Sequence, residues 1–463
     1  MIEPGRPLAS SGAGQDPAAE DLTSNLVLAL GAILVATFAA MVGLGIAFRE
    51  PAVLPALLVG GVLAVFLVGR PRWIAPVFVG LTWAALPGHV FGGLPSPVEA
   101  GGLVLLAFAA WRSLERPRLA ANVLVVMVLL SIPLVASAAL SPEGSALPAD
   151  DLREVFFLFI VALCVFGPGN AERVVVALVV TGLILGIGGI YSVLVGPTDL
   201  FPVITDVPTA IEPEAPRAGG PFGEPNFFAL SLAALTPLAL FVAVKGGWRR
   251  WLGLATLIAI AGAIFAAGSR GGAFAMLFAL VAFGFTTSNR QLRLAALMTV
   301  IGALALFPLF AGQASDSTAR STSGRETENR IALAMFGDYP VVGVGPHQYE
   351  VLYRDYSRNI GEDPRSTREP HSLYFEIAAE QGLVGLIGWG LVAVLVLSYV
   401  LSRGAWRTTL GRALLLSVAT YLVGSVFLHG SQLRLLFILV GLTMAYATDL
   451  HAGTSGDEGA EPA

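Results

Sequence analysis

The chain has 463 residues, of which 55% are hydrophobic and only 13% are charged, and its formal net charge is −5. Soluble domains carry roughly 25% charged residues, so this composition excludes a soluble protein and indicates a polytopic membrane protein. A nucleic-acid-binding protein is excluded too, because Lys245 is the only lysine and no basic stripe is present. The single cysteine, Cys164, excludes disulfides, and the histidines show no metal-ligand spacing. We therefore expect neither a metal nor another cofactor.

Long apolar runs follow one another along most of the chain. A helix of about 20 apolar residues crosses a bilayer, and this rule gives roughly fourteen spans, of which 98–111 is short enough to be re-entrant. The sequence therefore predicts an all-α fold, a polytopic membrane helix bundle of about 12–14 transmembrane helices with one large, partly helical outer loop. The predicted spans are 26–48, 52–69, 73–93, 98–111, 121–140, 152–167, 174–196, 226–244, 251–268, 272–287, 294–311, 372–400, 413–428 and 431–448.

The basic residues between these runs predict the orientation. With the N-terminus in the cytoplasm, every inner loop carries positive charge, as the positive-inside rule requires, and both termini are then cytoplasmic. The inner cations are Arg70, Arg72, Arg112, Arg116, Arg118, Arg173, Lys245, Arg249, Arg250, Arg290, Arg293, Arg403, Arg407 and Arg412.

Five parts of the chain follow from this topology. The two end segments are polar, and the first lacks the cleavage site of a signal peptide. The predicted parts are a disordered cytoplasmic tail at 1–25, a transmembrane bundle at 26–311, a large extracytoplasmic loop at 312–371, C-terminal transmembrane helices at 372–448 and a second disordered cytoplasmic tail at 449–463.

Arg270 is the only charge in the apolar run from Trp251 to Phe285. This run is too long for one span, so the sequence GSRGG is predicted to be an outward-facing turn between two short spans. An arginine on the outer side, where positive charge is disfavoured, indicates an anionic ligand. Arg217 is the only cation of another outer loop, 197–225, and a salt bridge to an acidic neighbour explains it equally well.

The outer loop 312–371 has seven arginines and nine acids, so it is not a basic patch. Ser323 and Glu326 form a predicted capping box, which places Arg325 in the first turn of a helix, where free backbone N–H groups favour anions. Arg330 has Glu326 as a partner one helical turn away, so an ion pair within the helix would explain the presence of Arg330 without a ligand. The sequence PVVGVGP then predicts a turn, and HQYEVLYRDYSR predicts a tyrosine-rich helix near the membrane interface.

His371 directly precedes the predicted span 372–400. The positive end of a helix dipole disfavours imidazolium, and a neutral imidazole can accept a proton. The alternative is that His371 only hydrogen-bonds loop backbone. Glu376 and Glu380 lie one and two turns further into the span, where acids usually face the interior of a bundle.

Four stretches of the sequence, in this order, resemble motifs of the O-antigen ligase/polymerase superfamily. They are RAGGPFGEPN, GSRGG, TSGR followed by DYPVVGVGPHQY, and HSLYFEIAAEQGLVGLIG, and the resemblance covers about residues 215–390. It implies an enzyme that transfers or polymerises glycan from an undecaprenyl-diphosphate carrier on the outer face of the bacterial inner (cytoplasmic) membrane. The pattern departs from the family at Ser372, where an asparagine is usual, and at Asn329, where an aromatic residue is frequent. The resemblance assigns catalytic places to Arg217, Arg270, Arg325 and His371.

The partners implied by the resemblance are a lipid-linked oligosaccharide donor, the phospholipid bilayer, and an acceptor that is a glycan, a lipid A core or a protein. Arg270 and Arg217 would hold the donor diphosphate, and His371 would orient or deprotonate the acceptor hydroxyl in a displacement with inversion. No acidic cluster of the DxD type occurs in the outer loops, so we expect a metal-independent reaction. Further candidate substrate-binding residues are Arg330, Asn226, Glu224, Glu380 and His347.

Several alternatives stay open at this point. The motifs do not separate a polymerase from a ligase. A polysaccharide transporter or flippase would place ionisable groups at mid-membrane, whereas most predicted spans lack them there. A cell-wall elongation-type glycosyltransferase also has many spans and a large outer loop, and a membrane scaffold without catalysis is the simplest alternative.

Overall fold

The chain divides into two compact units, Met1–Ile74 and Ala75–Ala463. The predicted tail 1–25 and the predicted spans 26–48 and 52–69 lie outside the described residues, as does most of 294–311. The computed structural model describes residues 71–84, 97–141, 145–167, 169–198, 201–204, 216–287, 315–361, 370–428 and 433–457, with a few single residues between 290 and 301.

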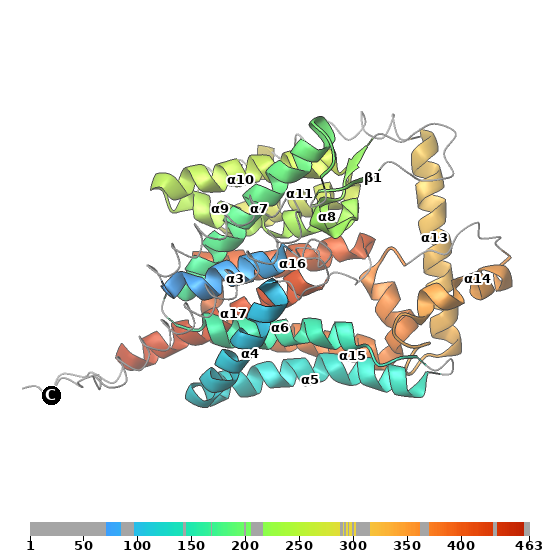
Figure 1. Cartoon of the computed structure of the whole chain (residues 1–463), viewed down its shortest axis with the longest axis horizontal. Coiled ribbons are helices and arrows are strands. Elements are labelled where there is room, and N and C mark those ends of the chain that lie inside the picture. Colours follow the sequence, from blue (N-terminus) through green and yellow to red (C-terminus); the bar gives the residue numbers. More distant parts are fainter. Residues whose placement is uncertain are drawn as a thin grey trace, which may run out of the picture. The chain divides into compact units, whose positions relative to one another are not determined.

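The described residues are mostly helical (Figure 1). Within the described residues, seven stretches are long and apolar enough to span a membrane, and α8 and α9 together form one of them. This confirms the predicted all-α, polytopic membrane bundle. The helices are α3 (Ile74–Trp83), α4 (Pro97–Glu115), α5 (Pro117–Leu140), α6 (Ala149–Val165), α7 (Asn170–Leu194), α8 (Pro225–Ala234), α9 (Thr236–Val244), α10 (Gly247–Ala266), α11 (Arg270–Thr286), α13 (Ser315–Asp338), α14 (Gln348–Asn359), α15 (Leu373–Ser402), α16 (Thr409–Gly424) and α17 (Arg434–Asp457).

The helices of the bundle pack in closely contacting groups. α10 lies beside α7 and α9, α17 beside α6, α5 beside α15, and α11 beside α8 and α16 (Figure 1). Glycine permits the closest of these approaches: a Cβ added to Gly253 of α10 would lie 2.5 Å from the carbonyl oxygen of Ala239 in α9. Such small residues are typical of membrane helix interfaces, where association depends on close packing.

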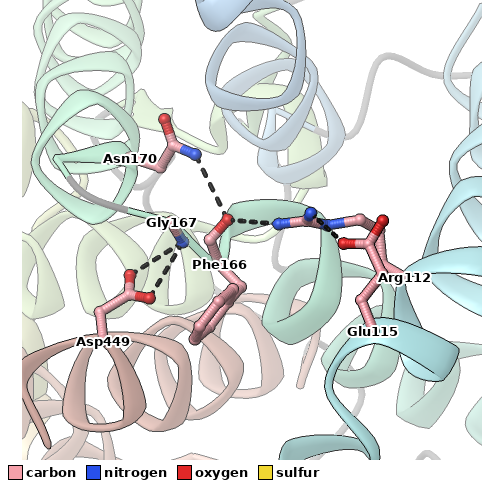
Figure 2. A network of polar contacts seen from close by, with 6 residues as sticks. All are labelled: Arg112, Glu115, Phe166, Gly167, Asn170 and Asp449. Carbon is pink, nitrogen blue, oxygen red and sulfur yellow. Dashed lines mark hydrogen bonds and ion pairs between the residues drawn. The ribbon is translucent and has the colours of Figure 1, made fainter. Parts of the chain in front are cut away.

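One end of the bundle is closed by a polar network around the connection between α6 and α7 (Figure 2). Both carboxylate oxygens of Asp449 in α17 accept the N–H of Gly167, at 3.1 and 2.9 Å. Arg112 of α4 donates to the carbonyl oxygen of Phe166 at 3.0 Å and to Glu115 at 2.5 Å (Figure 2). The guanidinium of Arg116 lies over the Phe166 ring, 4.4 Å from its centroid. These contacts join α4, α6, α7 and α17.

We call this end of the second unit the basic end, because predicted inner-loop cations gather there. Lys245 and Arg249, at the connection between α9 and α10, both pair with Glu172 in the first turn of α7. Arg412 of α16 donates to the carbonyl oxygen of Thr286 at the end of α11, at 2.6 Å. The cations that the sequence assigns to the cytoplasm thus anchor helix ends on one side of the bundle.

The polar helices α13 and α14 pack together and against α15, at the opposite end, which we call the loop end (Figure 1). Their shared core is apolar, so this segment is anchored on the bundle by hydrophobic burial. α13 begins at Ser315, so Ser323 and Glu326 lie inside it, and the predicted capping box and first-turn position of Arg325 are wrong. The buried core residues are Ile331, Ala332, Met335, Val344, Tyr349, Tyr353 and Ala379.

The helix α15 is interrupted at Gly382, whose backbone has φ 63° and ψ −153°. In hydrocarbon, backbone groups freed by such a break must find partners within the protein. The segment Pro340–Gly345, from the PVVGVGP sequence, supplies them. Its bonds join Val344 N to Ala379 O at 2.9 Å, Gly345 N to Glu380 O at 3.1 Å, Leu383 N to Pro340 O at 2.8 Å and Val384 N to Val341 O at 3.1 Å.

Candidate functional site

Arg217 lies in β2 (Arg217–Ala218), which pairs antiparallel with β1 (Val203–Ile204). Its Nε donates to the carbonyl oxygen of Ala267 at 2.8 Å, and a terminal nitrogen donates to the side-chain oxygen of Asn226 at 3.4 Å. Asn226 in turn donates to Glu224 at 2.9 Å, and the other oxygen of Glu224 accepts the N–H of Phe227 at 2.6 Å as the N-cap of α8. The RAGGPFGEPN motif therefore folds into a chain of contacts that orients the Arg217 guanidinium.

Arg270 is the first residue of α11 and is exposed. The hydroxyl of Ser269 caps this helix by accepting the N–H of Gly272 at 3.2 Å. Gly268 before it has φ +59°, and a Cβ added there would lie 3.3 Å from Nε of Arg217. The GSRGG sequence thus forms the expected turn between two helices, and this turn lies directly against Arg217.

Arg325 lies on α13 and is half-buried. Burial is the first cause that lowers its pKa below the ordinary value, and the positive charges of Arg270 and Arg217 lower it further, while Glu328 opposes them. Charges shift the pKa of a neighbouring group mainly over short distances. The structure therefore brings Arg217, Arg270 and Arg325 together at the loop end.

His371 lies beside a buried carboxylate. Its Nδ1 is 3.4 Å from Oε2 of Glu328, whose side chain is 1% exposed, whereas that of His371 is 35% exposed. Glu328 also acts on Arg325, so this carboxylate links His371 to Arg325. His371 is two residues before the start of α15, where the N–H of Leu373 donates to the carbonyl oxygen of Leu428 at 2.6 Å.

Glu380 and His347 lie beside this cluster and have other contacts. Oε1 of Glu380 accepts the N–H of Tyr349 at 3.2 Å, so this carboxylate satisfies the first turn of α14. Nε2 of His347 lies 3.0 Å from Oδ2 of Asp151 at the start of α6, and this hydrogen bond, against the opposing effect of burial, raises the pKa of His347 to about 9. Both candidates thus connect the segment 315–361, which contains α13 and α14 and which we call the loop module, to the bundle.

Arg330 is exposed on α13 and its terminal nitrogen lies 3.5 Å from the hydroxyl of Thr327. The charges that act on Arg325 are those of Arg270, Glu328 and Arg217, and Arg330 is not among them. Its predicted role in substrate binding stays a prediction.

Glu328 is the residue that the sequence analysis missed, since it counted only as one acid among nine. A signal was present: Glu328 shares the buried face of α13 with Ile331, Ala332 and Met335, at helical spacing. A carboxylate on an otherwise apolar stripe is buried on folding and therefore needs a partner.

Among the described residues, no group of three or more His, Cys, Asp or Glu side chains is arranged to hold a metal ion. A cavity of about 440 Å³ lies at the basic end, where its lining includes Glu172, Lys245, Thr408, Tyr446 and Asp449. It contains none of the predicted site residues, so it is separate from the arginine cluster.

The fold and this site define a polytopic α-helical membrane protein with a cluster of arginines and a histidine–carboxylate pair where a polar loop module meets the bundle. Residues 254–390 match the family model described as O-antigen ligase, which confirms the resemblance seen in the sequence. This part of the chain is thus similar to the O-antigen ligase family. The matched region contains Arg270, Arg325 and His371, and Arg217 precedes it. No curated protein matches the chain.

Proposed function

We propose that the chain transfers or polymerises glycan from an undecaprenyl-diphosphate-linked donor at the outer face of a bacterial inner membrane. The observation that carries the proposal is the meeting of Arg217, Arg270 and Arg325 with His371 at the loop end. The O-antigen ligase match supports a glycosyltransferase-like enzyme in a membrane, and the donor, the mechanism and the residue roles are our inference.

The arginines would hold the diphosphate of the donor. A guanidinium is planar, grips phosphate oxygens in pairs and keeps its proton, which suits a leaving group whose negative charge grows as the glycosidic bond breaks. Preorganised donors of this kind contribute about 3 kcal/mol each to the transition state. The bonds from Arg217 to Ala267 O and Asn226 provide such preorganisation, because they fix its guanidinium before the donor binds.

His371 would act on the acceptor. In this step the acceptor hydroxyl oxygen bonds to the anomeric carbon from the face opposite the diphosphate, and its proton passes to the imidazole. The bond from the anomeric carbon to the diphosphate oxygen breaks, and both electrons leave with the lipid diphosphate. The configuration at the anomeric carbon is inverted, and the arginines supply the charge stabilisation without a metal ion.

The orientation of the site follows from the charges at the two ends. Predicted inner-loop cations gather at the basic end, and the positive-inside rule assigns that end to the cytoplasm. We infer that the loop end faces outward and that both termini are cytoplasmic. A donor could then keep its polyprenyl chain in the bilayer while its diphosphate reaches the arginines.

The test is transfer from a synthetic lipid-linked oligosaccharide by purified protein in nanodiscs. We expect Arg270→Ala and His371→Ala each to lower the rate at least about 100-fold while membrane insertion and elution are unchanged. Arg358→Ala is the matched control, since Arg358 is an exposed arginine of α14 that pairs with Asp355 on the same helix, at 3.5 Å. Near-normal product from both Arg270→Ala and His371→Ala would refute the proposal.

The acceptor separates a polymerase from a ligase. Deletion of a polymerase should leave single lipid-linked repeats in the membrane, whereas deletion of a ligase should leave long lipid-linked polymer. Analysis of the accumulated glycolipid therefore identifies the acceptor class, and it does so independently of the residue roles.

A further inference from the structure

Glu328 is a buried carboxylate on the face of α13 that otherwise presents apolar side chains to the core of the loop module. Its side chain is 1% exposed, and its neighbours on the same face, Ile331, Ala332 and Met335, are fully buried. Burial of a charged carboxylate costs several kcal/mol unless opposite charge and hydrogen bonds offset it. Retention of a carboxylate at this position therefore calls for an explanation beyond packing.

The surroundings of Glu328 hold it in place on rigid elements. The hydroxyl of Tyr349, itself 1% exposed, donates to the backbone carbonyl oxygen of Glu328 at 2.8 Å. This bond fixes the middle of α13 against α14. On the other side of the pair, the N–H of Leu373 fixes the start of α15 against Leu428. Glu328 Oε2 and His371 Nδ1 thus lie on two anchored helices at an ion-pair distance of 3.4 Å.

We propose that Glu328 is a positioning residue for His371: its carboxylate accepts the Nδ1–H of the imidazole and so directs the lone pair of Nε2 toward the acceptor hydroxyl. The inference rests on the proposed function. A neutral imidazole carries one N–H and one lone pair, and the bond made by one nitrogen decides which role the other takes. The exposed part of His371 is then the part that can reach a substrate.

The charge of Glu328 has a second effect during transfer. When Nε2 takes the acceptor proton, the ring becomes an imidazolium at the N-terminus of α15, where the helix dipole disfavours positive charge. A carboxylate at Nδ1 stabilises that imidazolium, as an acid does for a catalytic histidine in hydrolytic triads. Glu328 also acts on Arg325, together with Arg270 and Arg217, and on Tyr349, together with Tyr353, Glu376 and Glu380.

The first experiment is Glu328→Gln, which keeps the shape of the side chain and an oxygen acceptor but removes the charge. With the lipid-linked oligosaccharide donor in nanodiscs, we expect kcat to fall about 10- to 10⁴-fold. The lower figure is typical of losing the partner of a metal-bound histidine, and the upper one of losing the aspartate of a hydrolytic triad. The KM for the donor should not rise, because the arginines stay in place. Glu326→Gln is the matched control: Glu326 is exposed two residues away on the same helix, and its kcat should be unchanged.

The second experiment is a double-mutant cycle. A residue that acts only through His371 has no further effect once the imidazole is gone, so Glu328→Gln should change the residual rate of His371→Ala less than twofold. An additional loss as large as in the wild-type background would show a structural role and overturn the proposal. If His371→Ala has no measurable rate, the test depends on kcat and KM of Glu328→Gln alone. An unchanged kcat, with or without a raised KM, overturns the positioning role of Glu328.

Stability and activity are separated by a third variant. If Glu328→Gln lowers the melting temperature, Glu328→Asp, which keeps the charge, should restore stability and part of kcat, and restored stability without kcat refutes the proposal. The two proposals can also fail separately. A fully active His371→Ala enzyme refutes the role of His371 itself, whereas an impaired His371→Ala with a fully active Glu328→Gln refutes only the role of Glu328.

Discussion

Gly343→Ala tests the contact that docks the loop module on the break in α15. Gly343 has φ +72°, and a Cβ added there would lie 2.3 Å from the carbonyl carbon of Glu380. An L-residue with left-handed backbone costs about 1 kcal/mol. The clash is with backbone, so it cannot be relieved by a rotamer change and must move the segment. The bonds from Val344 N and Gly345 N, at 2.9 and 3.1 Å, are then weakened at about 1 kcal/mol each, for a total of about 3 kcal/mol.

The assay is thermal unfolding in nanodiscs followed by intrinsic fluorescence, with glycan transfer measured on the same samples. Gly361→Ala is the control, because Gly361 has φ +79° but no atom within 4 Å of an added Cβ, so only the backbone cost of about 1 kcal/mol applies. We expect the larger loss of stability in Gly343→Ala, together with loss of transfer, since a shifted module separates Glu328 from His371. Equal melting temperatures of the two variants would refute the reasoning.

Three further predictions concern contacts around the bundle. Arg434→Met should lower the free energy of unfolding by about 2 kcal/mol, because Arg434 Nε lies 2.7 Å from Glu154 in a largely buried ion pair. The double variant Arg434→Met/Glu154→Gln should recover most of this loss, and no recovery would contradict the pairing. The pKa of His347 is raised to about 9, so its contribution to stability is complete below about pH 6.5 and is lost as pH rises through 9. Melting temperatures of wild type and His347→Gln should therefore converge between pH 7 and 10, by a small amount because the side chain is exposed. Glu224→Ala should cost about 1 kcal/mol through loss of the α8 cap, measured by unfolding, and unchanged stability would contradict the cap.

The spans could be predicted because hydrophobic length is a local property. The predicted runs 121–140 and 251–268 correspond to α5 and α10, and the predicted run 226–244 covers α8 and α9. The division between these last two helices was not predicted, although Pro237 lies in the first turn of α9 and removes a backbone donor there. Hydropathy reports the apolar content of a span and does not show a break between two helices inside it.

The start of α13 could not be predicted from the capping-box pattern. Ser323 and Glu326 match the pattern, but it specifies a helix end only when the preceding residues leave the helix. Here the polar residues from Ser315 onward are helical as well. The break in α15 at Gly382 could not be predicted from the local sequence either. The backbone groups freed there are hydrogen-bonded by the segment around Gly343, which is distant in sequence.

The predicted site residues came from local motifs, and their meeting depends on packing between separate elements. Arg270 is placed by the turn before α11, Arg325 by the core under α13, and His371 by the start of α15. Neither hydropathy nor spacing encodes the contacts among them. Glu328 was missed for the same reason, since its importance appears only when His371 is seen beside it.

The gathering of three guanidinium groups carries a free-energy cost, because like charges repel one another. Burial lowers the pKa of Arg325, and the charges of Arg270 and Arg217 lower it further, so each added cation makes the next one less favourable. Glu328 offsets part of this cost, and its carboxylate is shared with His371. A bound diphosphate would offset the remainder, because its negative charge grows during transfer in the place where the positive charges are already held. The same repulsion that destabilises the site without its substrate would then favour the transition state over the bound donor.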